Sequence, residues 1–95
     1  MSAQPVAMPR KIEAELRRIP GIGRAAAGDL YMLGMRSVAD LAEADPQTLY
    51  DRLCRLSGVR QDRCVLYVFR CAVYFARNTQ HEPELLKWWN WKNRS

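Results

Sequence analysis

Apolar residues recur every three or four positions along most of the chain, a spacing that predicts α-helices. The predicted helices cover about residues 9–18, 24–33, 37–44, 46–56 and 61–78, with a last short helix starting at Pro83. The residues expected to face inward on the first four helices are Ile12, Leu16, Ile19, Ala27, Leu30, Tyr31, Val38, Leu41, Leu49, Leu53 and Leu56. This pattern predicts an all-α domain.

Proline, glycine and capping residues mark the ends of these helices. Pro20 ends the first helix, and Gly34 and Gly58 are expected to end the second and the fourth. Ser37 lies three residues before an aspartate, which is the spacing of a capping box with the shorter acid. Asp45-Pro46 gives a similar start signal for the fourth helix.

The fifth predicted helix is apolar nearly all round, so other helices must enclose it. Its apolar residues are Val65, Leu66, Val68, Phe69, Ala72, Val73, Phe75 and Ala76. One narrow strip differs, because Arg63, Arg70 and Arg77 recur at heptad spacing. A buried guanidinium without a partner is very costly, so we expect the strip to face solvent or to pair with acids such as Asp62 or Glu84. An exposed strip would also be a candidate surface for a partner.

Three tryptophans, Trp88, Trp89 and Trp91, lie close together near the C-terminus. Neighbouring positions on a helix point about 100° apart, so at least one indole should be exposed. We expect Trp88 or Trp89 to cover the fifth helix. The alternative is a stacking surface for a partner protein or for unstacked bases, supported by nearby basic residues. These basic residues are Lys87, Lys92 and Arg94.

The turn after the first helix carries the most specific motif. The run Leu16-x-x-Ile-Pro-Gly-Ile-Gly-x-x-x-Ala27-x-x-Leu30 resembles the helix-hairpin-helix signature. The two glycines permit positive φ, and the turn leaves amide N–H groups bare at the start of the next helix, where they favour a phosphate oxygen. The candidate nucleic-acid contacts are Gly21, Ile22, Gly23 and Arg24. The alternative is a plain helical hairpin without a ligand, in which Ile22 plugs the gap between the helices.

A weaker copy of this motif follows 37 positions later. Leu53, Leu56, Gly58, Val59 and Cys64 fall on Leu16, Ile19, Gly21, Ile22 and Ala27. Arg60 replaces the second glycine, where positive φ would cost about 1–2 kcal/mol, so the second hairpin should have a different backbone. Such pairs resemble the double helix-hairpin-helix domains that grip both strands of a duplex, and Gly58 and Arg60 join the candidate contacts.

Charge supports this interpretation without establishing it. The net charge is +5, and most of the 15 basic residues are arginines, which suit bidentate contact with phosphate or carboxylate. No run approaches the roughly 20 apolar residues of a membrane span. Residues 1–9 lack the apolar region of a signal peptide and read as a flexible tail. We therefore expect a cytoplasmic protein that does not contact membranes.

Residues that could serve catalysis or metal binding are not arranged for either role. Cys54, Cys64 and Cys71 form no C-x-x-C pair and read as reduced thiols, the last two as core residues on one helix face. His81 falls in a predicted turn beside Glu82, where a surface position is expected. A DNA glycosylase shares the hairpin but needs further helices to hold a flipped base. We expect no enzyme activity, no metal and no cofactor.

Three longer runs carry a family resemblance over about Lys11 to Lys92. They are Asp45-Pro46-x-x-Leu49-Tyr50, then residues 62–76 from Asp62-Arg63-Cys64 to Tyr74-Phe75-Ala76, and then residues 83–92 with Trp88-Trp89-Asn90-Trp91. They look like the small bacterial pathogenicity-locus family, some of whose members are labelled mitomycin-resistance proteins. The resemblance implies a SAM-like helix-hairpin-helix fold related to the C-terminal domain of competence regulators. It implies no established activity, although the family name suggests DNA damage.

These observations predict an all-α fold of five to six short helices with tandem helix-hairpin-helix motifs, the first intact and the second degenerate. We expect a tail over residues 1–9, the tandem domain over 10–78 and a tryptophan-rich cap over 79–95. The predicted function is sequence-independent binding of duplex DNA, in DNA repair or damage resistance. The alternative is a protein-interaction module in which the arginine strip or the tryptophans hold an acidic or DNA-repair protein.

Overall fold

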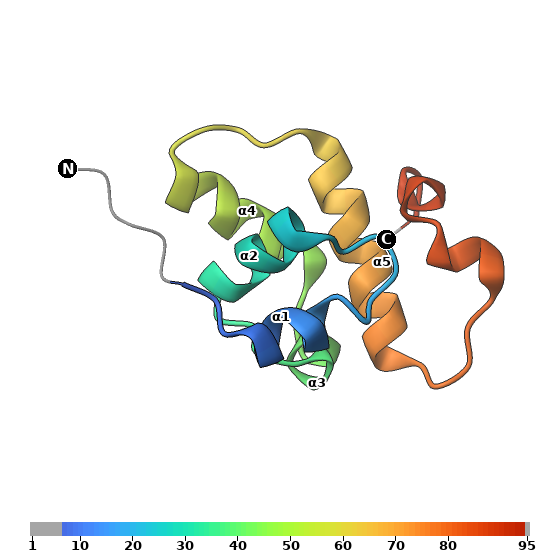
Figure 1. Cartoon of the computed structure of the whole chain (residues 1–95). Coiled ribbons are helices and arrows are strands. Elements are labelled where there is room, and N and C mark those ends of the chain that lie inside the picture. Colours follow the sequence, from blue (N-terminus) through green and yellow to red (C-terminus); the bar gives the residue numbers. More distant parts are fainter. Residues whose placement is uncertain (1–6, 95) are drawn as a thin grey trace.

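The structure, a computed structural model, describes residues 7–94, which form five α-helices and two 3-10 helices without a strand (Figure 1). The elements are α1 (Arg10–Leu16), α2 (Arg24–Met32), α3 (Val38–Ala42), α4 (Pro46–Ser57), α5 (Arg63–Arg77), η1 (Pro83–Leu86) and η2 (Trp88–Trp91). The all-α prediction is confirmed. The predicted helix ends shift by a few residues, and the last predicted helix is two 3-10 helices instead. Of the tail predicted for residues 1–9, residues 1–6 lie outside the described part.

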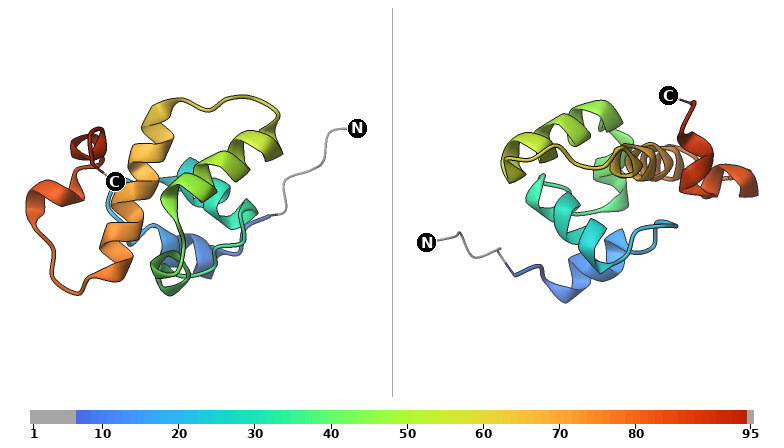
Figure 2. Two further views of the ribbon diagram at one scale, coloured as in Figure 1. Left: turned by 180° about the vertical axis from the view of Figure 1, so that it is seen from behind. Right: turned by 90° about the horizontal axis from the view of Figure 1, so that it is seen from above.

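Helix α5 is the centre of the fold, as its apolar circumference predicts. Seen end-on in Figure 2, α5 lies between α4 on one side and the C-terminal segment on the other, and α3 also packs against it. Helices α1 and α2 pack against each other. The buried residues of α5 are Leu66, Phe69, Cys71, Ala72 and Val73.

Side-chain caps and glycines set the helix ends, as predicted. The Asp45 carboxylate accepts the Thr48 N–H at 2.9 Å at the start of α4, and Gly58, with φ 75°, ends that helix. Gly34 likewise has positive φ, 96°. The capping box at Ser37 is incomplete, because the acid three residues on accepts the N–H of Arg36 rather than that of Ser37.

The prediction that Leu56 belongs to the buried stripe of α4 is wrong, since this side chain is 56 % exposed. Helices α4 and α5 diverge, and the loop over residues 58–62 bridges the gap between them (Figure 1). The last turn of α4 therefore has little to pack against. Cys64, predicted to lie in the core, is exposed for a related reason, because it stands on the first turn of α5.

The tryptophan that joins the core is Trp91, not Trp88 or Trp89 as predicted. Trp91 is 7 % exposed, and its indole Nε1 donates to the Leu85 carbonyl at 2.8 Å. Trp89 is 56 % exposed, which confirms that one indole remains outside. The 3-10 turns of η1 and η2 fold the chain back on itself, so the last of the three indoles reaches α5. Residues 79–94 are a packed cap on that helix.

The arginine strip of α5 is not a uniform solvent face, and its partners are not the predicted acids. Arg70 donates to the Trp91 carbonyl at 2.9 Å. Arg77 donates to the carbonyls of Ala42 and Ala44, both at 3.0 Å. The free carbonyls at the ends of η2 and α3 lie against α5 and satisfy these two guanidinium groups. Of the three arginines in the strip, only Arg63 is exposed and has no hydrogen bond to another described residue.

His81 is also more buried than its predicted surface position. Its ring stacks on Phe75 with centroids 4.6 Å apart and an angle of 13° between the planes. A ring nitrogen lies 3.0 Å from the Phe75 carbonyl oxygen, and the Tyr74 ring meets the imidazole edge-on. His81 therefore helps to hold the cap on α5.

Candidate nucleic-acid interface

The turn between α1 and α2 has only part of the expected geometry. Gly21 has φ 85°, so this position favours glycine. The Ile22 side chain is 5 % exposed, and its N–H donates to the Ile19 carbonyl at 3.1 Å. Ile22 is therefore the plug between the helices, and its amide already has a partner within the turn, so the amides that follow it are the better candidates for a phosphate contact.

Gly23 caps α2 in an extended conformation, with φ −92° and ψ −168°, so the expected positive φ at this glycine is wrong. Within residues 7–94, the N–H groups of Gly23, Arg24 and Ala25 have no acceptor, and no side chain caps α2. A Cβ on Gly23 would have no neighbour within 4 Å, so these amides are open to a ligand. Arg24 is exposed beside them. This helix end attracts anions.

The second hairpin repeats the first only in part. Gly58 has φ 75°, close to the 85° of Gly21. The positions equivalent to Ile22 and Ala27 are exposed, whereas those two residues themselves are buried. No non-glycine residue in the described part has positive φ, so Arg60 does not carry the cost that positive φ would impose.

The amide end of α5 is closed to anions by a carboxylate. Asp62 accepts the Cys64 N–H at 2.8 Å, and this bond lowers the pKa of Asp62. An ionised cap repels phosphate at this helix end. The second hairpin therefore offers arginine side chains rather than bare amides to a ligand.

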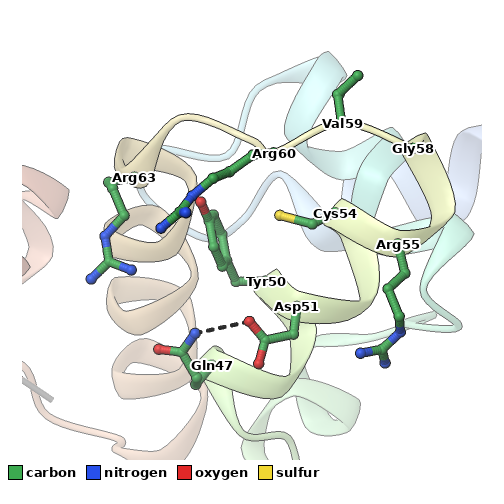
Figure 3. A pocket seen from close by; sticks show the side chains of 9 residues that line it. All are labelled: Gln47, Tyr50, Asp51, Cys54, Arg55, Gly58, Val59, Arg60 and Arg63. Atoms are coloured by element: carbon green, nitrogen blue, oxygen red, sulfur yellow. Dashed lines mark hydrogen bonds between the residues drawn. The ribbon is translucent and has the colours of Figure 1, made fainter.

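Arg55, Arg60 and Arg63 line a shallow hollow of about 510 Å³, which we name the arginine hollow (Figure 3). Its lining residues are Gln47, Tyr50, Asp51, Cys54, Arg55, Gly58, Val59, Arg60 and Arg63. The Tyr50 hydroxyl donates to the Gln61 carbonyl, and the Arg63 guanidinium lies 5.9 Å from the centre of the Tyr50 ring. Asp51 accepts a hydrogen bond from Gln47, and no carboxylate of residues 7–94 pairs with the three arginines.

A second hollow of about 330 Å³, the aromatic cleft, lies on the other side of Arg63. It is lined by Asp62, Arg63, Cys64, Tyr67, Trp88, Trp89 and Lys92. The half-buried Trp88 lies over the first hairpin, since a Cβ on Gly21 would be 3.2 Å from its Cδ1. Arg63 lines both hollows. Arg63 thus links the two hollows, and Trp88 links the aromatic cleft to the turn at Gly21; we name these three parts together the basic surface.

Apart from Ile22 and Gly23, which lie in the first turn, the predicted site residues fall into three groups. Gly21, Trp88, Trp89, Gly58, Arg60 and Arg63 lie on the basic surface. Arg24 lines a different hollow with Met8 and Met32. The third group, Arg70, Arg77 and Trp91, stabilises the fold through hydrogen bonds to backbone carbonyls. The sequence did not indicate the contact between Trp88 and Gly21, because the two residues are distant in the chain.

Other functional chemistry has little support in the described residues. No group of three or more His, Cys, Asp or Glu side chains in this part could hold a metal ion. Burial raises the pKa of the Cys71 thiol to about 11, and a hydrogen bond with Asp62 raises the pKa of Cys64, so neither thiol is activated. None of the helices in residues 7–94 has the length and apolar character needed to cross a bilayer.

Comparison with known proteins places the chain in a family. The family model described as Cdd1, pathogenicity locus, matches residues 9–95. A curated relative, the mitomycin resistance protein McrB of Streptomyces lavendulae, is 30 % identical over 78 residues, which cover 82 % of this chain and 70 % of the relative. No solved structure matches the chain. On the extent of the family match and the identity to this relative, the chain belongs to the pathogenicity locus family.

Proposed function

We propose that this protein is a binding module, not an enzyme, that holds DNA without regard to base sequence. One observation carries the proposal: Arg63 lines both the arginine hollow and the cleft that reaches Gly21. A strand could follow this surface from the first hairpin to the loop between α4 and α5. Contacts to phosphate fix the position of a protein on DNA but carry no sequence information.

We expect two places to bind phosphate in different ways, the start of α2 after the turn at Gly21 and the α4–α5 loop. At α2, the bare amides of Gly23 and Arg24 and the positive end of the helix dipole hold a phosphate oxygen. At the α4–α5 loop, Arg55, Arg60 and Arg63 supply charged, forked donors. We expect a dissociation constant of about 10⁻⁴ to 10⁻⁶ M, the range of non-specific binding.

The arginines assigned to DNA are those that the fold leaves free. Arg17 and Arg18 form ion pairs with acids of their own helix, at 3.1 and 3.0 Å. Arg36 donates to the Tyr31 carbonyl and lies over the Tyr31 ring. Arg60 and Arg63 have no ion pair among the described residues. Arg17 is therefore a matched control for the two proposed contacts.

The test is titration of two unrelated labelled duplexes of about 20 base pairs between about 50 and 200 mM salt, read by fluorescence anisotropy. Both duplexes should bind equally well. Arg60→Ala and Arg63→Ala should each weaken binding and reduce the slope of log K against log salt by about 0.9, as should Arg24→Ala. Arg17→Ala should change neither quantity. Failure of the wild type to bind at low salt, with its circular dichroism intact, would remove the proposal.

The same experiment addresses the alternative, a module that binds an acidic protein or a DNA-repair protein. Leu56 and Val59 favour it, because they are 56 % and 60 % exposed where α4 meets the arginine hollow. An acidic amphipathic partner would cover both the apolar and the basic residues. If no nucleic acid binds, this alternative becomes the proposal.

The name of the Streptomyces relative extends the proposal to mitomycin resistance. Cells that lack the protein should then be more sensitive to mitomycin. A copy with Arg60→Ala and Arg63→Ala should fail to restore resistance, whereas a copy with Arg17→Ala should restore it. Full rescue by the double variant would separate resistance from DNA binding.

A further inference from the structure

Trp89 has no structural task that explains its exposed position. Trp91 fills the core, and Trp88 covers Gly21, but Trp89 is 56 % exposed. Its ring meets that of Trp88 nearly at right angles, with centroids 5.6 Å apart and an angle of 86° between the planes. This edge-to-face contact supports an indole that lines the cleft and stays largely exposed. A supported aromatic face is a stacking site for a planar ligand.

The charges in the cleft favour an anionic ligand. Arg63 and Lys92 line it and have no ion pair among the described residues. Asp62 also lines it, but its carboxylate is bonded to the start of α5. The volume of about 330 Å³ lies at the small end of the range of ligand sites, about 300–1,000 Å³, which suits one nucleotide better than a duplex.

We propose that the aromatic cleft holds one unpaired base of a nucleic-acid strand, stacked on Trp89, with the adjoining phosphates on Arg63 and Lys92. This inference rests on the proposed function and defines its substrate. Arg63 lines both the cleft and the arginine hollow, so a strand held by the arginines can enter the cleft where its bases are unpaired. The preferred ligand is therefore DNA with a single-stranded end rather than a blunt duplex.

The test compares a blunt duplex with the same duplex carrying an overhang of about six thymidines. Stacking of one base is worth about 1–3 kcal/mol, so the overhang should improve affinity by about 5- to 150-fold. Trp89→Ala should abolish this advantage, so that the duplexes with and without the overhang bind equally well, whereas Trp89→Phe should keep part of it. Binding of the overhang should also quench tryptophan fluorescence in the wild type, more than the blunt duplex does.

Met32→Ala is the matched control, since Met32 is 52 % exposed but lies outside the aromatic cleft. It should preserve the advantage of the overhang. Salt-dependent binding of the blunt duplex with no gain from the overhang, or a gain that survives Trp89→Ala, overturns the inference and leaves the proposed function standing. Trp89-dependent binding of single strands without duplex binding supports the inference and overturns the duplex proposal. Absence of any nucleic-acid binding overturns both.

Discussion

Trp88 lies directly over Gly21, so closely that a Cβ added to the glycine would be 3.2 Å from the indole Cδ1. This contact joins the C-terminal cap to the turn of the first hairpin. Gly21 has two reasons to be glycine, its φ of 85° and this close approach. Gly23 has neither, because its backbone is extended and nothing lies within 4 Å of a Cβ there. The openness at Gly23 leaves the α2 amides accessible.

Identical substitutions should therefore have opposite consequences at the two glycines. Gly21→Ser should lower the free energy of unfolding by at least about 1–2 kcal/mol, because it forces positive φ on a side chain and displaces Trp88. Gly23→Ser should leave stability unchanged or raise it by a few tenths of a kcal/mol, because serine is a better N-cap than glycine. Urea denaturation measures both changes.

Gly23→Ser should nevertheless weaken DNA binding, because the serine oxygen accepts the amides that phosphate would use. The slope of log K against log salt should stay near that of the wild type, since no charge is removed. Equal losses of stability at both glycines would contradict the extended conformation of Gly23.

Helix ends were predictable from the sequence because neighbouring residues decide them. The cap by Asp45 and the left-handed Gly58 are local features with known residue preferences. The exposure of Leu56 was not predictable in the same way. Its spacing is correct for the stripe, but the divergence of α4 from α5 leaves it exposed, and that divergence depends on the whole fold.

The candidate site shows the same division between local and distant effects. The motif located the turn, the bare amides and Arg24, all within a few residues of one another. The sequence could not reveal that the Ile22 N–H donates to the Ile19 carbonyl, because the backbone path of the turn decides this. Nor could it place Trp88 on Gly21, a contact between opposite ends of the chain.

Variants of Trp91 and Trp89 should separate the role of the tryptophans in stability from their role in recognition. Trp91→Ala should lower the free energy of unfolding by about 3–5 kcal/mol, because it removes a buried indole, its bond to the Leu85 carbonyl and its contact with Tyr74. Trp89→Ala should cost less than about 1 kcal/mol, the value of its contact with Trp88. Thermal melts followed by circular dichroism measure both. A large loss with Trp89→Ala would mean that this indole belongs to the core after all.

Acid should destabilise the protein through its bonded carboxylates. The N–H of Thr48 bonded to Asp45 lowers the pKa of that carboxyl, and the N–H of Val38 bonded to Glu15 does the same. A carboxyl whose pKa is lower in the folded state contributes stability that is complete above its unfolded value, about 4, and is lost as the pH falls through the folded value. The melting temperature should therefore decrease as the pH is lowered below about 4.

Asp45→Asn isolates the share of this effect that comes from one cap. Asparagine caps helices about as well as aspartate, so stability at pH 7 should change by less than about 1 kcal/mol. The decline in melting temperature between pH 5 and pH 3 should become shallower, because position 45 no longer titrates. An unchanged acid profile would place the titration elsewhere.

The last prediction concerns the two ends of the arginine strip. Arg77 holds the carbonyls of Ala42 and Ala44, so Arg77→Met should lower the free energy of unfolding by about 1–2 kcal/mol. Arg63→Met should change it by less than about 0.5 kcal/mol, because Arg63 has no hydrogen bond in the described part of the chain.

The effects of the two substitutions on DNA binding should follow the opposite order. Arg63→Met should reduce the salt slope by about 0.9, whereas Arg77→Met should leave it unchanged while the protein stays folded. The two residues share one helix and a heptad spacing, so only their surroundings can cause this reversal. Equal losses of DNA affinity with no change in unfolding would mean that the strip acts as one surface and that the bonds of Arg77 to the carbonyls after α3 do not hold in solution.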